Sequence, residues 1–181
     1  MFDPIDNDLR AAATALRDVV APAVDPANPI AQQQLKLVLD WLEFYRQRAP
    51  QAWRLDAFEL SSQAALARAV LAAVPPGQGE ALTQALQAAA EAGALAREGP
   101  ARLRAAVTAL EDALSATVRA STAFPLQMQR EVERLVVAGT RPWLLAQRAW
   151  YSPLSIEPDP QALPHLDDAL RPIEATPDTL P

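Results

Sequence analysis

Alanine makes up 39 of the 181 residues, and prolines divide the alanine-rich stretches into segments of helix length. Alanine has the highest intrinsic helix propensity, whereas proline lacks a backbone donor and disfavours helix in the residue before it. Within the segments apolar residues recur every three or four positions, and no alternating run of strand length recurs. The sequence therefore predicts an all-α fold, a compact bundle of five to seven helices with an extended, acidic, Pro-rich C-terminal tail.

The proline breaks and capping residues set the expected helices. An Asp-Asn pair at residues 6–7 is suited to cap the first helix, and paired serines could divide the third near residue 61. Gly139 has the character of a C-terminal cap, after which Thr140 could cap a short last segment with Pro142 in its first turn. We expect helices over residues 6–23, 30–48, 51–74, 80–97, 101–120 and 125–138, and a short segment from 140.

The clearest helical period lies in the expected helix over 101–120. Its apolar face consists of Leu103, Val107, Leu110, Leu114 and Thr117, and we expect Leu110 and Leu114 to be buried. Small residues at helical spacing on this helix and the one before it predict a closely packed antiparallel hairpin. These alanines are Ala85, Ala89, Ala92 and Ala96 on the first helix and Ala105, Ala109, Ala113, Ala116 and Ala120 on the second.

Length and charge suggest a body and a tail. Residues 1–151 carry a formal charge of −1 and residues 152–181 a charge of −5. We expect the first part to form one helical-bundle domain and the second an acidic tail. The charged run at 130–134 has i,i+3 partners of its own and is expected to be a solvated helical face. Because a nucleic-acid binder needs a basic face, this distribution argues against nucleic acid as a partner.

The absence of cysteine excludes disulfides, thiolate metal sites and thiol catalysis. The first residues are acidic, where a secretory leader would be basic and then apolar. The longest charge-free run, residues 69–79, is shorter than the ~18–20 apolar residues of a transmembrane helix. We therefore expect a cytoplasmic protein with no membrane span.

Side chains that catalyse reactions or bind metals are scarce. The single histidine, His165, lies in the Pro-rich tail, where a catalytic base would lack rigid support. Asp40 and Glu43 suggest a metal site, but Lys36 and Arg46 at helical spacing explain them as surface ion pairs. We therefore expect no catalytic residue, no metal ligand and no cofactor.

Seven of the ten aromatic side chains lie on the second expected helix, just beyond it, or near the end of the body. Trp and Tyr are costly to bury without a partner for their polar atom, and they are favoured at interfaces. In one interpretation the C-terminal segment closes a core against the second helix; in the other these side chains form an interface or a ligand pocket. The candidate residues for that interface or pocket are Trp41, Tyr45, Trp143 and Trp150.

The tail contains one amphipathic stretch. Leu163, Leu166, Leu170 and Ile173 share a helical face, so residues 163–173 are a candidate docking helix. A helix of this length is marginal alone in water and needs a surface, either on a partner or on this chain. Docking would bury Leu166 and Leu170 most. The other interpretation is a disordered, solubilising tail.

These observations favour a non-enzymatic helical accessory or adaptor protein that acts through protein–protein interaction or self-association, so that the partner is another protein or a second copy. The alternative is a helical bundle that binds a small apolar ligand between its helices, which would require an enclosed cavity. A helical coat for lipid is disfavoured because the chain has one lysine and no basic excess. An enzyme that relies on Arg and carboxylates is a further, weaker hypothesis.

Overall fold

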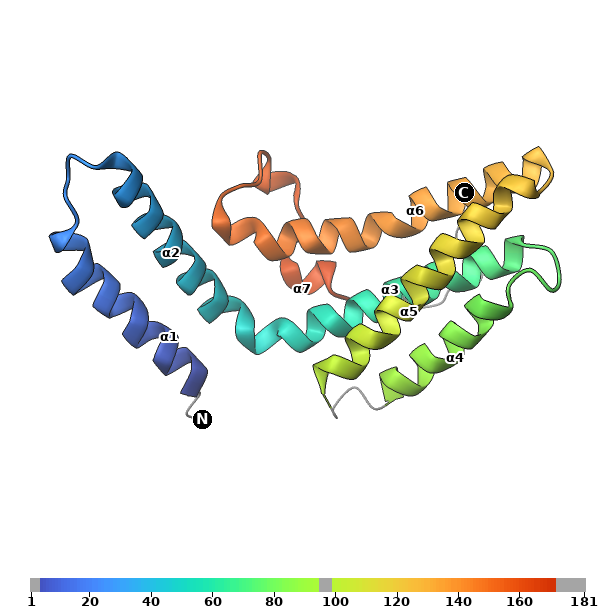
Figure 1. Cartoon of the computed structure of the whole chain (residues 1–181), viewed down its shortest axis with the longest axis horizontal. Helices are drawn as coiled ribbons and strands as arrows, with labels where there is room; N and C mark the ends of the chain where they lie inside the picture. The colour runs from blue at the N-terminus through green and yellow to red at the C-terminus, as the bar shows by residue number, and fades with distance from the viewer. Residues whose placement is uncertain (1–3, 95–98, 172–181) are drawn as a thin grey trace. The chain divides into compact units, whose positions relative to one another are not determined.

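The computed structural model describes residues 4–94 and 99–171, and within them every regular element is helical. Figure 1 shows the elements along the chain. They are α1 (Pro4–Ala15), α2 (Pro29–Arg48), α3 (Ala52–Ala73), α4 (Glu80–Ala94), α5 (Pro100–Ala120), α6 (Leu126–Tyr151) and the four-residue α7 (Leu166–Ala169), with short 3-10 turns and one π-helical turn between or beside them. The predicted all-α fold is confirmed for these residues.

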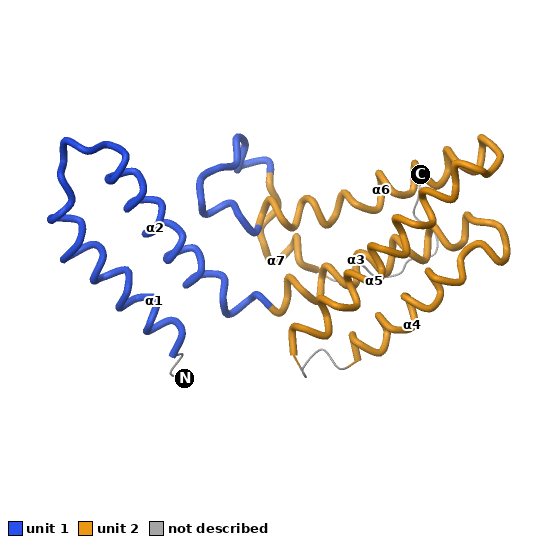
Figure 2. Tube along the Cα trace, in the orientation of Figure 1, with its two compact units in different colours: residues 1–52, 150–162 blue, residues 53–149, 163–181 orange. Residues whose placement is uncertain are grey.

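The chain separates into two compact units (Figure 2). Unit 1 comprises Met1–Ala52 and Trp150–Ala162, and unit 2 comprises Trp53–Ala149 and Leu163–Pro181. These boundaries differ from the body and tail expected from charge and proline content. A compact unit is defined by contacts between segments that are far apart in sequence. Such contacts cannot be predicted from local composition, so the boundaries differ.

Unit 1 contains a helical hairpin of α1 and α2. Asn28 caps α2, because its side-chain oxygen accepts a hydrogen bond from the amide of Ala31 at 3.1 Å. Asp6 does not cap α1, which already begins at Pro4. The Asp6 carboxylate instead pairs with Arg10 at 2.7 Å on the same helix and with Arg46 at 3.1 Å on α2. The second pair joins the two helices of the hairpin.

Helices α3, α4, α5 and α6 supply the core of unit 2. All five residues of the apolar face predicted on α5 are buried, with Leu110 at 0% and Leu114 at 6% exposure, which confirms that prediction. The larger side chains of the core are Leu60, Leu66, Val70, Leu82, Leu103, Val107, Leu110, Leu114, Val132 and Leu135.

The hairpin of α4 and α5 forms as the alanine spacing predicted, but α5 uses a different set of alanines. Ala85, Ala89 and Ala92 of α4 are buried in the core cluster. On α5 the buried alanines are Ala106 and Ala113, whereas the predicted Ala105, Ala109, Ala116 and Ala120 are exposed. The prediction for those four residues is wrong, because the leucines of α5 determine which side of the helix faces the core. Ala96 lies outside the described residues.

Two expected helix breaks do not occur. Helix α3 continues through Ser61, whose hydroxyl donates to the carbonyl of Phe58 at 2.8 Å. Helix α6 continues through Gly139 and Pro142, so neither the cap at Gly139 nor the new start at Thr140 exists. The Thr140 hydroxyl donates back to the carbonyl of Val136 at 2.9 Å within the same helix.

Gly139 serves packing instead of capping. A Cβ atom at this position would lie 2.7 Å from Cδ1 and 3.2 Å from Cβ of Leu66 on α3. The missing side chain therefore permits a close approach of α6 to α3. The packing of α6 also offsets the backbone hydrogen bond that Pro142 cannot donate.

Candidate interaction surfaces

Phe44 is the centre of an aromatic cluster in unit 1. Its ring is 2% exposed and makes edge contacts with Trp41 at 5.4 Å and Tyr45 at 5.5 Å between centroids. It also stacks on Tyr151 at 5.5 Å and meets Trp150 edge-on at 6.3 Å. Residues from the end of the body thus close on α2, as the first interpretation of the aromatic residues proposed.

Arg48 holds Trp150 in this cluster from a second side. The guanidinium lies 5.5 Å from the centroid of the Trp150 ring, and Nε donates to the Trp150 carbonyl at 3.0 Å. Desolvation lowers the pKa of Arg48. The combined cation–π and hydrogen-bond contact fixes the start of the C-terminal part of unit 1 against α2.

The structure brings together only part of the predicted aromatic site. Trp41, Tyr45 and Trp150 all join the Phe44 cluster of unit 1, whereas Trp143 belongs to unit 2. Trp150 is buried at 6% exposure, and Tyr45 remains 54% exposed. Sequence reasoning did not select Phe44, although its place between Trp41 and Tyr45 on the broad apolar face of the helix was a usable signal.

Besides buried Phe44, α2 carries a group of apolar side chains that are exposed to solvent. Ile30 is 71% exposed, Leu37 and Val38 are each 46% exposed, and Tyr45 is 54% exposed. Their spacing of i, i+7, i+8 and i+15 puts them on one side of the helix together with Trp41. We call Ile30, Leu37, Val38, Trp41 and Tyr45 the α2 stripe.

Most charged residues of α2 lie away from this stripe and are paired. The exception is Arg48, which lies on the same side of the helix as Ile30 and is bound to the carbonyl and ring of Trp150. Lys36 forms an ion pair with Asp40, and Arg46 pairs with Glu43 at 2.7 Å. The hydrogen bonds from Arg46 hold the pKa of Glu43 well below its ordinary value. These pairs are the ones predicted from helical spacing, so Asp40 and Glu43 are accounted for without a metal.

Burial differs sharply between the two units. In the described part of unit 1 the buried apolar side chains are Ala13, Phe44 and Trp150. The large apolar side chains exposed there are Ile5, Val19, Val20, Ile30, Leu37, Val38, Tyr45, Tyr151 and Ile156. The described part of unit 1 therefore leaves more large apolar side chains exposed than it buries.

The C-terminal leucines are buried within the chain itself. Leu166 is 7% and Leu170 is 5% exposed, as expected, while Leu163 is partly buried. The helix is shorter than predicted, because α7 spans only Leu166–Ala169 and the backbone leaves helical geometry before Pro172. Ile173 lies outside the described residues.

Two polar contacts fix α7. Arg54 of α3 pairs with Asp167 at 2.6 Å, and its hydrogen bond lowers the pKa of that carboxyl. His165 acts as the N-cap, since its Nδ1 accepts from the amide of Asp167 at 3.3 Å. The histidine therefore has a structural contact at the start of α7.

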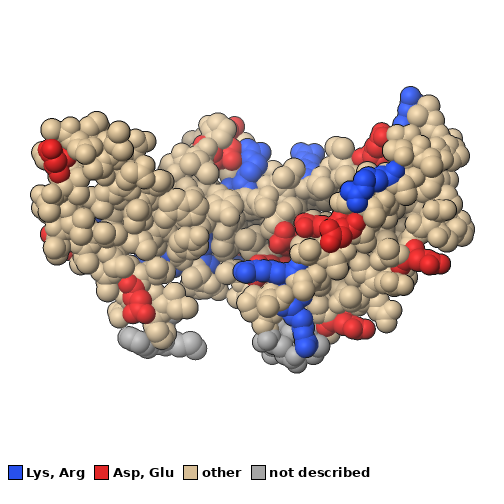
Figure 3. Space-filling view, viewed as in Figure 1, with Lys and Arg blue, Asp and Glu red and all other residues tan. Residues whose placement is uncertain are grey.

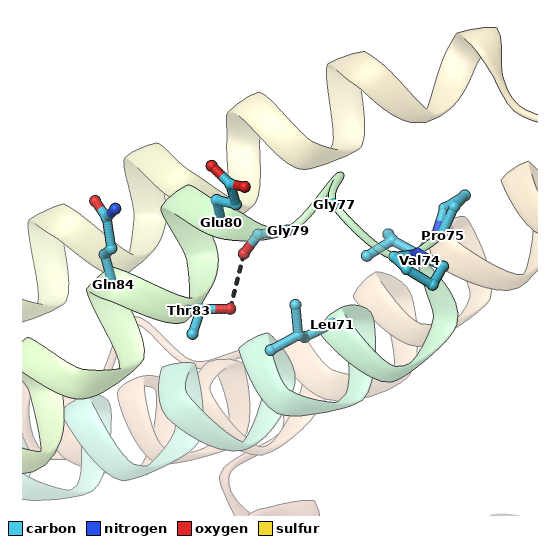
Figure 4. Close-up of a pocket in the computed structure, with 9 residues that line it drawn as sticks. Leu71, Val74, Pro75, Gly77, Gly79, Glu80, Thr83 and Gln84 are labelled. Carbon is cyan, nitrogen blue, oxygen red and sulfur yellow. Dashed lines mark hydrogen bonds between the residues drawn. The ribbon is translucent and has the colours of Figure 1, made fainter.

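The described part of unit 2 contains open hollows, among them one at a turn and one between three helices. The first, of about 430 Å³, lies over the turn between α3 and α4 (Figure 4). Gly77 gives this turn its positive φ of 83°, and the Thr83 hydroxyl donates to the carbonyl of Gly79 at 3.0 Å. Leu71 lies close to Gly79, which leaves no room for a side chain there. This hollow is a consequence of the glycine-dependent turn.

The second hollow is a cleft of about 560 Å³ between α3, α5 and α6. Apolar side chains from all three helices line it, with Glu111 and Arg119 among its polar residues. The apolar lining residues are Leu66, Leu114, Val118 and Val136. The sequence did not predict this cleft, because its walls come from three helices that are far apart in sequence.

Glu59 of α3 carries a perturbed carboxyl near this region. Desolvation raises its pKa to about 7, and the charges of Glu111 and Asp56 add to the effect while Arg104 opposes it. Glu111 also accepts a hydrogen bond from Gln63 at 3.3 Å. Ionisation of the Glu59 carboxyl therefore destabilises the folded state.

The free energy of unfolding of unit 2 is therefore expected to decrease as the pH rises from about 4.5 to 7, because Glu59 loses its proton over this range. The folded state holds the proton more tightly than the unfolded state, so the benefit is complete below pH 4.5 and lost above pH 7. Because Glu59 is only partly buried, solvent screening reduces the effect to about 1–2 kcal/mol. Glu59→Gln should be more stable than the parent by this amount at pH 8 in urea unfolding, and the difference should shrink at pH 5.

Glu91→Gln, at an exposed position of α4, is the matched control and should follow the parent at both pH values. An equal pH response in the parent and in Glu59→Gln would contradict the assignment.

Among the described residues, no group of three or more His, Cys, Asp or Glu side chains is arranged to hold a metal ion. No helix in the same residues is long and apolar enough to cross a membrane. Comparison of the chain with protein-family models, with curated proteins and with solved structures finds no match. The function must therefore be argued from the surfaces described above.

Proposed function

We propose that this protein is a non-enzymatic accessory or adaptor protein that binds another protein molecule through the α2 stripe of unit 1. The observation that carries the proposal is the exposure of Ile30, Leu37, Val38 and Tyr45 on one side of one helix, where the first charged residue is Arg48 at the C-terminal end. A helix of this kind usually turns such side chains toward a core. A second protein surface would complete that core.

The chemistry of the stripe favours protein over lipid. Membrane-surface helices carry Lys and Arg along the border of their apolar face. On α2, Lys36 is neutralised by Asp40, and Arg46 is neutralised by Glu43 and Asp6. Arg48, at the end of the stripe, is bound to the carbonyl and ring of Trp150. An apolar stripe one helix wide is the usual pattern for a helix that packs into a groove or against another helix.

A photo-crosslinking residue at Leu37 tests the proposal in the source cells. We expect a crosslink from Leu37 to a discrete protein, which includes a second copy of this chain, and its loss when Tyr45→Glu is added. The matched control is the same crosslinker at Gln47, which lies on the charged side of α2 and bonds to Glu43. The absence of a crosslink at Leu37, or the same products at both positions, would contradict the proposal.

Sedimentation of the purified chain separates self-association from binding of a different protein. If the stripe pairs with a second copy, Leu37→Glu with Val38→Glu should convert a dimer to a monomer. Both side chains are nearly half exposed, so helicity by circular dichroism should be preserved.

The second candidate is binding of a small apolar ligand in the cleft of unit 2. The apolar floor of Leu66, Leu114 and Val136 favours it. Ligand sites usually enclose most of the surface of their ligand, and this cleft is open along its length. A saturable thermal shift with alkyl or aromatic probes that Leu114→Gln abolishes, while the α2 variants retain it, would favour this candidate.

A further inference from the structure

Helix α6 has two distinct sides. Its inner side enters unit 2, with Val132 at 0%, Leu135 at 6% and Ala146 at 0% exposure. Its outer side is solvent-exposed and contains both apolar and charged residues. This outer face consists of Leu126, Arg130, Glu133, Val137, Arg141, Leu144 and Arg148, which follow one another at spacings of three or four residues.

The apolar members of the outer face are prominently exposed. Leu126 is 60% exposed, Val137 is 74% exposed and Leu144 is 53% exposed. Each of them is followed four residues later by an arginine, namely Arg130, Arg141 and Arg148. Residues four apart are neighbours on a helix, so every exposed apolar side chain has a guanidinium one turn away.

The sign of charge on this face is opposite to that of the whole chain. The face carries three arginines and one glutamate, whereas the chain has a net charge of −6. Arg134 beside the face is paired with Glu131 at 2.7 Å, and Glu133 accepts a hydrogen bond from Gln129 at 3.0 Å. Basic side chains recur along the course of α6 in the space-filling view (Figure 3).

We propose that the outer face of α6 is a second binding surface, which takes an acidic amphipathic helix of another protein. Charge complementarity selects the acidic partner, and the apolar residues between the arginines supply the buried contact. A second copy of α6 is a poor occupant, because two such faces together would place six arginines against two glutamates. An anionic membrane is also a poor occupant, since the net charge of −6 opposes an extended anionic surface.

This inference is independent of the α2 stripe, because the two surfaces differ in residues and in chemistry. One is mainly apolar, with a single arginine at its end, and the other alternates apolar and basic residues. A chain with both surfaces has one binding surface on each of its two units. That property is expected of an adaptor.

The test uses the full chain and two synthetic helical peptides. In the acidic peptide, leucines recur at spacings of seven and eleven residues, each with a glutamate one turn away; in the basic peptide, lysine replaces every glutamate. Fluorescence anisotropy should show binding of the acidic peptide that weakens as salt rises. Reversal of two charges, Arg130→Glu with Arg141→Glu, should weaken that binding by about tenfold or more and allow the basic peptide to bind instead.

The control carries the same net charge change elsewhere in unit 2. Arg68→Glu with Arg104→Glu, both at exposed positions of other helices and outside the cleft, should bind the acidic peptide as the parent does. Arg130→Gln with Arg141→Gln should weaken binding of the acidic peptide without creating binding of the basic one. Circular dichroism of each variant checks that α6 remains folded.

Three results would overturn the proposal. The first is a parent chain that fails to bind the acidic peptide at low salt. The second is an equal loss of binding in the Arg68 and Arg104 control, because net charge alone would then explain the effect. The third is binding to vesicles that contain anionic phospholipid, lost on charge reversal, without binding of the peptide, because the face would then recognise lipid.

Discussion

Replacing Leu110 with alanine is expected to lower the free energy of unfolding of unit 2 by about 2–4 kcal/mol. Leu110 is 0% exposed at the centre of the face that α5 turns toward the core. Truncation removes buried methyl groups and leaves a cavity that the surrounding helices fill only in part. Urea unfolding followed by circular dichroism should show a lower midpoint with an unchanged native spectrum.

Leu144→Ala is the control for this prediction. Leu144 is 53% exposed on the outer face of α6, so its truncation should change stability by less than about 0.5 kcal/mol. Unchanged stability in Leu110→Ala would show that the core face of α5 is not the one described.

Gly139→Ala is expected to destabilise unit 2 by about 1–2 kcal/mol, even though alanine is the better helix former. The new methyl group would lie 2.7 Å from Cδ1 and 3.2 Å from Cβ of Leu66, which forces α3 and α6 apart or moves Leu66 from its rotamer. Overpacking of this kind costs about 1–3 kcal/mol, and the gain in helix propensity recovers up to about 1 kcal/mol. Urea unfolding measures the net effect.

Gly93→Ala in α4 provides the matched comparison with the opposite sign. The added methyl group would lie 3.8 Å from Cδ2 of Leu60, an ordinary contact, so stability should rise by up to about 1 kcal/mol. A double-mutant cycle isolates the clash: in a Leu66→Ala background, Gly139→Ala should lose most of its cost. A Gly139→Ala variant as stable as Gly93→Ala would show that the close approach of α6 to Leu66 does not occur.

The positions of the helices were largely predictable from the sequence. Proline and capping residues act within one or two turns, so local signals are sufficient to predict α2, whose N-terminus lies beside Asn28, and α5, which begins at Pro100. The apolar period of α5 likewise predicted its buried face, because a helix with one leucine-rich side has one favourable orientation in a core.

The candidate surfaces were only partly predictable. The aromatic residues of α2 and the buried leucines at 166 and 170 were visible as patterns, but not that Trp143 belongs to a different unit from Trp41, Tyr45 and Trp150. The raised pKa of Glu59 requires the neighbouring carboxylate of Glu111, 52 positions along the chain, to come near it. Local sequence patterns do not predict a long-range contact of this kind.

The helical class, most helix boundaries and the face that α5 buries follow from local signals, since they depend on backbone hydrogen bonding and apolar spacing within a few turns. The continuous helix through Gly139 and Pro142 depends instead on tertiary packing, because the packing of α6 outweighs local breaking signals. Packing also determines which apolar side chains of α2 are covered. Burial depends on what the rest of the chain places against a residue, and on the α2 stripe it leaves four large side chains exposed.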